Sequence, residues 1–249
     1  MNSQTQTAMQ QVRQWLEQAK HVAVLTGAGV SAESGVPTFR DTQKGYWAEF
    51  DVQDMASVSG YRSNPARVWQ WYSERRELML HVQPNPGHTA LASYAQQHPG
   101  KLTLVTQNVD GLHERAGSPH VIALHGELMG NCWLNDACPM CDAQAALSAG
   151  GQLPQCSACG NMLRPAVVWF GENLPAQALQ DAEAAAQQCD LMLAIGTTGA
   201  VYPAAGLVFQ AHQRGAKIVI INPDDTELDG IADVCLKGTS AQILPELFL

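Results

Sequence analysis

Basic residues and long apolar runs are both scarce in this chain. It holds 14 lysines and arginines against 23 aspartates and glutamates, a formal net charge of −9 at pH 7. Non-specific binding to nucleic acid needs a basic face that neutralises phosphates, so we expect no nucleic-acid partner. No stretch reaches the roughly 18 consecutive apolar residues of a membrane-spanning helix, so we expect no membrane partner either. An acidic surface is compatible with lysine-rich peptide partners.

The first twenty residues contain no apolar segment of the kind that directs export. We therefore expect the protein to stay in the cytoplasm, where its seven cysteines would be reduced or bound to metal instead of paired in disulfides. With 249 residues, of which 46% are hydrophobic and 15% charged, the chain can bury one large core, with or without a small satellite. The sequence does not indicate an oligomeric state.

Short apolar runs, each followed by small or polar residues, alternate with helical patterns. An amphipathic helix is expected first, because apolar residues recur at positions 9, 12, 15, 16 and 19. The runs are 21–25, 102–105, 121–124, 191–195, 217–221 and 233–236, with helices expected at 176–189 and 204–214. This alternation predicts an α/β fold with a doubly wound parallel sheet. Ligands of such sheets bind beyond the carboxyl ends of the strands.

Two segments interrupt the alternation. Residues from about 41 to 87 hold aromatics and a helical stretch, and residues from about 127 to 165 hold five of the seven cysteines. We interpret both as insertions that pack together as a smaller module within one catalytic domain of residues 1–249. The large part would then comprise residues 1–40, 88–126 and 166–249.

A glycine-rich turn follows the first apolar run. Gly27 and Gly29 would let the backbone approach a pyrophosphate, whose charge the N-terminus of a following helix would favour. A tight strand-to-helix turn without a ligand would have the same glycines. Gly35 and Pro37 interrupt the helix that a dehydrogenase would continue, so we expect a loop over the bound ligand.

Six blocks of the sequence resemble the sirtuin family, in the same order, over residues 10–249. They are GAGVSAESGVPTFRD (27–41), TQNVDGLHERAG (106–117), HG (125–126), RPAVVWFGE (164–172), GTT (196–198), where the family usually has GTS, and INPDD (221–225). The resemblance implies a Rossmann-like sheet and cleavage of the co-substrate NAD⁺ at its glycosidic bond. Acyl groups would leave lysine side chains of protein partners, giving nicotinamide, free lysine and O-acyl-ADP-ribose.

Three residues are candidates for catalysis. His125 ends an apolar run, and a histidine with a pKa near neutrality suits a base that takes a proton from a ribose hydroxyl. Asn108 and Asp110 follow another run and could hold ribose hydroxyls and the nicotinamide amide. A histidine that caps a strand, and a turn rich in Asn and Asp, are the structural alternatives. His113 is expected to belong to the start of a structural helix.

The resemblance also implies a set of residues that contact the cofactor. Phe39 would shield the reactive ribose, and Arg40 would contact phosphate or ribose, although both could serve loop packing. The full set is Gly27, Ala28, Gly29, Ser31, Pro37, Thr38, Phe39, Arg40, Gln107, Asn108, Val109, Asp110, Gly196, Thr197, Thr198, Asn222, Pro223, Asp224 and Ser240.

The cysteines predict one structural zinc ion. Cys138 and Cys141 form one C-x-x-C pair, Cys156 and Cys159 a second, and 14 residues (142–155) separate the pairs. Four thiolates fill a tetrahedral site and leave no open position for catalysis. Cys132 is a rival ligand of the first pair, since the family's first pair usually follows His-Gly more closely. Two further cysteines, at positions 189 and 235, are expected to be apolar fillers.

A helix that begins at Pro65 is the candidate acyl pocket. Tyr72 and Arg75 are three residues apart and share one face with Val68 and Met79. A phenol beside a guanidinium can bind a carboxylate, and the pair resembles that of the sirtuin subgroup that accepts succinyl and malonyl lysines. Arg75 could instead reach solvent or pair with a neighbouring Glu. The family's substrate backbone pairs with the block that contains Val167, Val168 and Phe170.

Other functions remain open at this level. A plain NAD-dependent lysine deacetylase would need Tyr72 and Arg75 to be structural. A sirtuin-like ADP-ribosyl transferase would leave ADP-ribose on protein. A non-catalytic module that binds NAD or ADP-ribose is disfavoured because Asn108, Asp110 and His125 are all present.

Overall fold

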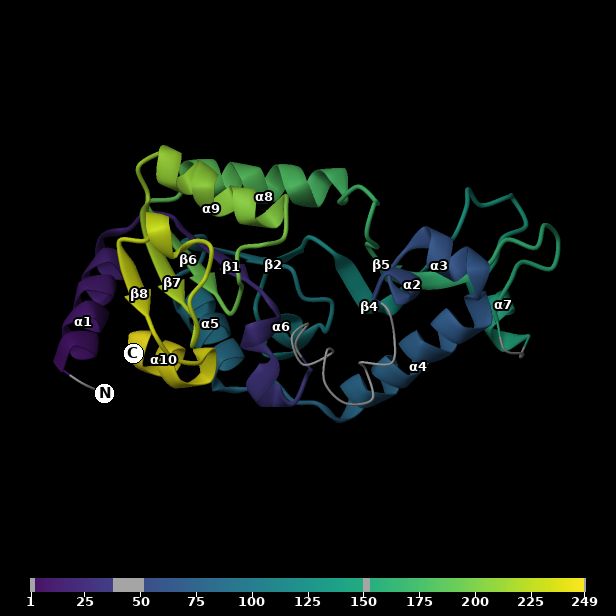
Figure 1. Ribbon diagram of the computed structural model, residues 1–249, viewed down its shortest axis with the longest axis horizontal. Coiled ribbons are helices and arrows are strands. Elements are labelled where there is room, and N and C mark those ends of the chain that lie inside the picture. The colour runs from purple at the N-terminus through teal and green to yellow at the C-terminus, as the bar shows by residue number, and fades with distance from the viewer. Residues whose placement is uncertain (1–2, 38–51, 150–152, 249) are drawn as a thin grey trace.

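The fold is built on a six-stranded parallel sheet (Figure 1). The computed structural model describes residues 3–37, 52–149 and 153–248. Its strands lie in the order β3-β2-β1-β6-β7-β8. They are β1 Val22–Thr26, β2 Leu102–Thr106, β3 Val121–Ala123, β6 Leu191–Ile195, β7 Lys217–Ile221 and β8 Val234–Leu236. Each coincides, to within a residue at either end, with an apolar run of the sequence, so the predicted doubly wound sheet is confirmed.

Helices cover both faces of this sheet. One face carries α1 Ser3–Gln18, α5 Pro86–Gln97 and α10 Ser240–Leu247, and the other carries α8 Ala176–Gln188 and α9 Ala204–Gln213 (Figure 1). The opening helix was predicted from its apolar stripe, and Met9, Val12 and Leu16 of that stripe are buried against the sheet. Among the described residues, no helix is both long and apolar enough to cross a bilayer.

A second part of the molecule lies beside the carboxyl edge of the sheet (Figure 1). Its antiparallel strands are β4 Gly126–Trp133 and β5 Leu163–Val167. Its helices are α2 Val52–Met55, α3 Val58–Ser63, the long α4 Pro65–His81 and α7 Ala143–Ser148, while α6 Leu112–Arg115 follows β2. A third hydrophobic cluster joins these elements except α7, with Met55, Tyr61, Tyr72 and Trp169 among its buried members. Both inserted segments contribute to this cluster, whereas the module boundaries given above stay a prediction.

Arg76 connects α4 to β4 by hydrogen bonds from its guanidinium. Its Nε donates to the carbonyl oxygen of Leu128 at 2.7 Å, and its Nη2 donates to that of Gly130 at 2.7 Å. The guanidinium also lies over the ring of Trp69, 5.3 Å from the centroid. Charge-assisted hydrogen bonds to two carbonyls of one strand fix the helix along that strand.

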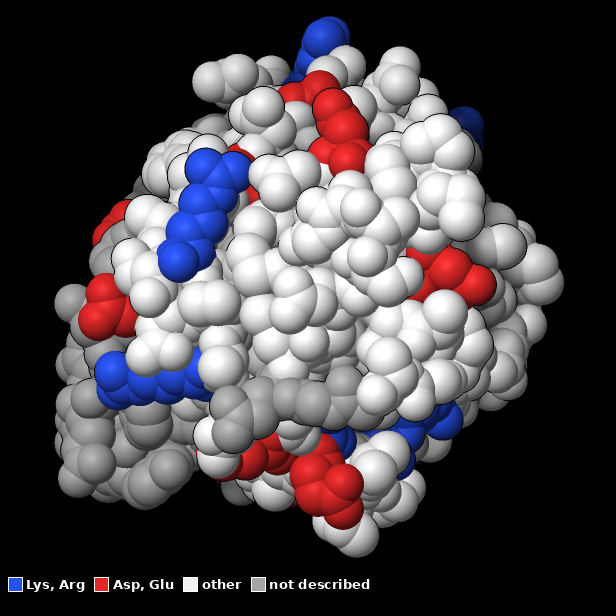
Figure 2. Space-filling view, turned by 90° about the vertical axis from the view of Figure 1, so that its right-hand side faces the viewer, with Lys and Arg blue, Asp and Glu red and all other residues white. Residues whose placement is uncertain are grey.

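The end of the second part presents charges of both signs. On the face seen in Figure 2, Lys and Arg side chains stand apart from one another among uncharged residues and several Asp and Glu. The described residues of this face therefore form no continuous basic area of the kind that follows a nucleic-acid backbone.

The turns after β1 and β6 cross at the point where the strand order reverses. Gly27 N–H donates to Ile195 O at 3.0 Å, and Gly29 N–H donates to Gly196 O at 2.9 Å. A Cβ on Gly29 would lie 2.8 Å from the Cα of Gly196, and Gly196 itself has a φ of 61°. These glycines are therefore required by the contact between two turns, whether or not a phosphate also approaches them.

The sequence predicted that the N-terminus of a helix after β1 would favour the charge of a pyrophosphate. The turn after β1 does not lead into such an α-helix. It continues as two short 3-10 helices, η1 Ala28–Val30 and η2 Ala32–Ser34. Gly35 then adopts a left-handed conformation with a φ of 87° at the end of η2. Because Pro37 follows closely, the helical stretch cannot be prolonged. The part of the expected loop that follows Pro37 lies outside the described residues.

Replacing Gly29 by Ala should destabilise the fold by about 1–3 kcal/mol, because the added methyl would force two backbones apart. Urea unfolding, with the midpoint compared at an unchanged slope, measures the effect. Gly230→Ala is the matched control, since a Cβ there meets open space, and its effect should stay within about 0.5 kcal/mol. Equal stability of the two variants would contradict the crossing-turn argument.

Candidate active site

A buried polar cluster lies beneath the glycine turn. Ser31 is fully buried and Asp110 is 8% exposed. The Ser31 hydroxyl donates to Asp110 Oδ2 at 2.7 Å, and Asn108 Nδ2 donates to Ser31 Oγ at 3.2 Å. The second Asp110 oxygen accepts from the backbone N–H of Leu112 at 2.9 Å, so the carboxylate is hydrogen-bonded on both oxygens. Two predicted site residues, Asn108 and Asp110, are thus joined to a third from a different strand end.

His88 was not expected at this site. Its Nδ1 accepts from the backbone N–H of Asn85 at 3.3 Å, so its Nε2 carries the proton and faces Ser31 Oγ at 3.3 Å. Burial lowers the pKa of His88, although Asp110 raises it. Its one local signal is the capping box that Asn85 and His88 form at the start of α5. That signal gives no indication of Ser31, which lies 57 residues away.

His125 follows β3 and is half-buried at the sheet edge. Its Nδ1 lies 2.9 Å from the carbonyl oxygen of Gln107. A carbonyl accepts only, so Nδ1 carries the proton and Nε2 presents a lone pair. Burial lowers the pKa of His125, against the carbonyl bond, which raises it. The ring is therefore neutral near pH 7 and able to take a proton.

His113 has the structural place expected of it. It lies in α6, is 1% exposed, and its Nε2 is 2.9 Å from Thr26 Oγ1 at the end of β1. Burial lowers its pKa to about 3, so it stays neutral and takes no part in proton transfer at physiological pH.

The other predicted cofactor residues line the ends of β2, β6 and β7. Gln107 Nε2 donates to Thr197 Oγ1 at 3.1 Å, across β1. Asn222 is 7% exposed and its amide holds the carbonyl oxygen of Asp224 at 2.9 Å, while Asp224 itself is exposed. Ala28 begins η1, and the other described members not yet placed lie in irregular segments that follow strand ends or η2, namely Pro37, Val109, Thr198 and Pro223.

Two parts of the predicted cofactor set differ from the rest. Ser240, at the start of α10, is 4% exposed, and its hydroxyl donates to Val30 O at 3.3 Å. This bond ties α10 to the glycine turn and gives Ser240 a packing role of its own. Thr38, Phe39 and Arg40 lie outside the described residues.

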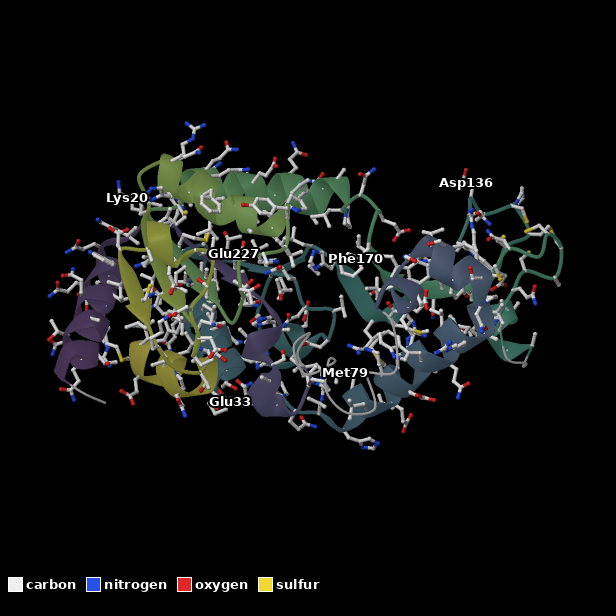
Figure 3. The ribbon with its side chains drawn as sticks, in the orientation of Figure 1. Lys20, Glu33, Met79, Asp136, Phe170 and Glu227 are labelled. Atoms are coloured by element: carbon white, nitrogen blue, oxygen red, sulfur yellow. The ribbon has the colours of Figure 1, made fainter. Side chains whose placement is uncertain are left out.

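Four cysteines converge at the far end of the second part, beyond Asp136 (Figure 3). The Sγ atoms of Cys138, Cys141, Cys156 and Cys159 all lie within 4.8 Å of one another. The Sγ atoms are 3.6 Å apart in Cys138 and Cys141, 3.7 Å apart in Cys141 and Cys159, and 3.9 Å apart in Cys138 and Cys156. A tetrahedral zinc ion with Zn–S bonds of about 2.3 Å places its sulfurs about 3.8 Å apart, so the donor set fits zinc.

Cys132 is not part of that cluster. It lies on β4, where its Sγ contacts the carbonyl oxygen of Pro165 at 3.7 Å. The alternative in which it replaced a ligand of the first pair was wrong, because the strand holds it against β5. Cys189 is buried in the sheet core as expected, whereas Cys235 on β8 is exposed and is no apolar filler.

Tyr72 and Arg75 lie one turn apart on α4. The helix begins with Pro65, capped by Asn64 Oδ1, which accepts from Arg67 N at 3.2 Å. Tyr72 is 4% exposed, and the Arg75 guanidinium lies 4.6 Å from the ring centroid of Trp71. Burial lowers the pKa of Arg75, and the nearby Tyr72 raises it.

The strand that ends in Val167 meets the sheet edge near Phe170, which is 45% exposed (Figure 3). The backbone N–H of Val168 donates to His125 O at 2.8 Å, so the segment touches the predicted base. Several main-chain groups here are already used: Val167 O accepts from Arg164, and Phe170 N–H donates to Ala56 O at 2.9 Å. A substrate strand would have to pair with the remaining groups.

Comparisons with known proteins agree with this geometry. The Sir2 family model matches residues 27–203. An NAD-dependent protein deacylase of Ralstonia nicotianae is 52% identical over 237 residues, which cover 95% of this chain and 94% of that protein. A crystal structure of a Sir2 homologue in complex with NAD has a TM-score of 0.84 at 41% identity, over 96% of this chain and 92% of the other. A Sir2 complex with a p53 peptide and NAD⁺ has a TM-score of 0.81 at 30% identity, over 96% of both chains.

A doubly wound sheet with its polar residues at the strand reversal defines a nucleotide-binding α/β protein. With the family model covering most of its length, the chain belongs to the Sir2 family.

Replacing Cys141 by Ser should abolish zinc retention and unfold the strands around the cluster, because a structural zinc supplies much of the folding free energy of its site. Metal content after dialysis, measured by plasma mass spectrometry, should fall from one ion per chain to nearly none. Cys132→Ser is the control and should keep its zinc. Loss of zinc from that control, or its retention in the first variant, would show that the ligand set is different.

Proposed function

We propose that this chain is an NAD-dependent protein-lysine deacylase that removes succinyl and malonyl groups, and also acetyl groups. Its products would be nicotinamide, free lysine and O-acyl-ADP-ribose. The deacylase activity is supported by relatives of that name, by the NAD complex of a homologous structure and by the polar edge of the sheet. The observation that carries the acyl preference is the buried phenol of Tyr72 one helical turn from the half-buried guanidinium of Arg75 on α4, where burial lowers the pKa of Arg75.

His125 is the proposed base. Bound NAD⁺ supplies a ribose with a cleavable glycosidic bond and hydroxyl groups. The free Nε2 of His125 accepts the proton of such a hydroxyl, and the Gln107 carbonyl stabilises the charged ring through Nδ1–H. Asn108 keeps its carboxamide at the same edge through its bond to Ser31. The Asp110 carboxylate accepts a hydrogen bond from the Ser31 hydroxyl and so holds Ser31 in place.

The acyl pocket rests on electrostatics. Burial raises the pKa of Tyr72, which therefore remains a neutral donor at any physiological pH. Arg75 stays charged but is costly to bury, so an anion that enters beside it recovers part of the lost solvation. The carboxylate at the end of a succinyl or malonyl chain is such an anion, whereas an acetyl group offers none.

Pairing of Arg75 with an acid on its own helix was the main structural alternative. Glu74 Oε1 instead accepts from Gln70 Nε2 at 3.0 Å. Glu77 Oε1 lies 3.5 Å from His81 Nε2. Both acids are exposed and each contacts another residue of α4.

Wild-type protein should remove succinyl from a lysine peptide faster than acetyl, with NAD⁺ consumed and O-succinyl-ADP-ribose formed. Arg75→Met should lower kcat/KM for the succinyl peptide about 10- to 100-fold, because a charge-assisted hydrogen bond is lost. The acetyl peptide should change less than about 3-fold. Mass spectrometry of both peptides, with and without NAD⁺, measures each outcome.

The matched control is Arg67→Met, on the exposed face of the same helix, and it should leave the ratio of the two rates unchanged. Equal relative losses on both peptides in Arg75→Met would remove the acyl-pocket argument. Turnover of acetyl alone would leave a deacetylase. ADP-ribose that remains on protein would indicate a transferase, and NAD⁺ binding without turnover a binding module.

We expect kcat/KM to fall as the pH is lowered, with the midpoint of this decrease below pH 6.5. The active form of His125 is neutral, and its lowered pKa keeps it neutral until the pH falls beneath the ordinary histidine value of 6.5. Initial rates between pH 5 and 8 at peptide concentrations well below KM, with saturating NAD⁺, give the profile. A midpoint above 6.5 would mean that a different group controls the rate.

A further inference from the structure

Trp169, in the segment that follows β5, is joined to Tyr72 on α4 by one hydrogen bond. Its indole Nε1 lies 2.8 Å from the hydroxyl oxygen of Tyr72, 97 residues away in sequence. Both side chains are buried, at 2% and 4% exposure. An indole nitrogen can only donate, so the Tyr72 oxygen must be the acceptor.

This bond determines where the Tyr72 proton points. A phenol oxygen that accepts from one side directs its own O–H elsewhere. Among the described residues, Trp169 is the sole hydrogen-bond partner of the Tyr72 hydroxyl. The O–H is thus left to donate to a group that enters the pocket, and acceptance from Trp169 polarises it into a stronger donor.

Trp169 is itself held in place from three sides. The guanidinium of Arg164 lies over its ring, 3.6 Å from the centroid, and the ring of Tyr61 is 5.2 Å away. Its backbone N–H donates to Glu172 Oε2 at 2.8 Å. Arg164 holds Glu172 through both oxygens, at 2.5 and 2.8 Å. An indole that turned away from Tyr72 would therefore lose its ring contacts with Arg164 and Tyr61.

We propose that Trp169 is a positioning residue for acyl specificity, which orients the Tyr72 O–H toward the carboxylate of an acidic acyl group. The proposal rests on the acyl preference proposed above. Trp169 acts through Tyr72 and does not itself touch the acyl group. Trp169 directly precedes Phe170 in the sequence. The segment expected to pair with the substrate backbone would therefore also orient the Tyr72 O–H that donates to the acyl carboxylate.

Trp169→Phe removes the N–H and keeps an aromatic ring. It should lower the ratio of kcat/KM for succinyl over acetyl peptide about 3- to 10-fold, chiefly through KM for the succinyl peptide. A purely structural role would reduce both activities in parallel and leave the ratio unchanged. Trp133→Phe on β4 is the matched control and should leave the ratio at the wild-type value.

A double-mutant cycle identifies the route. Tyr72→Phe should lower the same ratio at least as much as Trp169→Phe, and the double variant should equal Tyr72→Phe alone. Additive effects, or an unchanged ratio in Trp169→Phe, would overturn the proposal. If wild-type protein shows no preference for succinyl, the proposed function fails first. Thermal unfolding midpoints show which variants are folded, and if Trp169→Phe does not fold, Tyr72→Phe compared at two acyl lengths still tests the oriented donor.

Discussion

The contact between two glycine turns is the constraint on which the site depends. Strands β1 and β6 are neighbours in the sheet, yet the chain leaves one for β2 and the other for β7, so their turns diverge from a shared origin. Gly27, Gly29 and Gly196 let those turns touch through backbone atoms alone. Side chains at these positions would force the strand ends apart and open the edge to which Ser31 and Gln107 are attached.

Beneath that contact, the polar residues are arranged by a few buried bonds. Ser31 receives hydrogen bonds from Asn108 and faces His88, and it donates to Asp110. A buried network of this kind is stable only when each member is satisfied, which fixes each side chain in one orientation. His125, which follows β3, lies outside the cluster, and its tautomer is set by the carbonyl of Gln107 at the end of the neighbouring strand β2.

Much of the fold could be predicted from local patterns. Buried parallel strands are short apolar runs, and such runs are visible without knowledge of their neighbours. The zinc ligands were equally accessible, because their spacing is local. Trp169 and His88 could not be found in this way, since their partners are 97 and 57 residues away and carry no shared pattern. The missing α-helix after β1 has a local cause, namely the left-handed Gly35, but the two 3-10 helices before it have no distinct signature.

The bonds of Arg76 have a consequence for how specificity changes during evolution. They bind the helix that carries Tyr72 and Arg75 to a strand that pairs with β5. None of those elements contributes a strand to the six-stranded sheet. If α4 recognises the acyl group as proposed, changes in α4 would alter which modified lysine is accepted without altering any strand of the six-stranded sheet, so paralogues could diverge in acyl choice on an unchanged nucleotide-binding sheet.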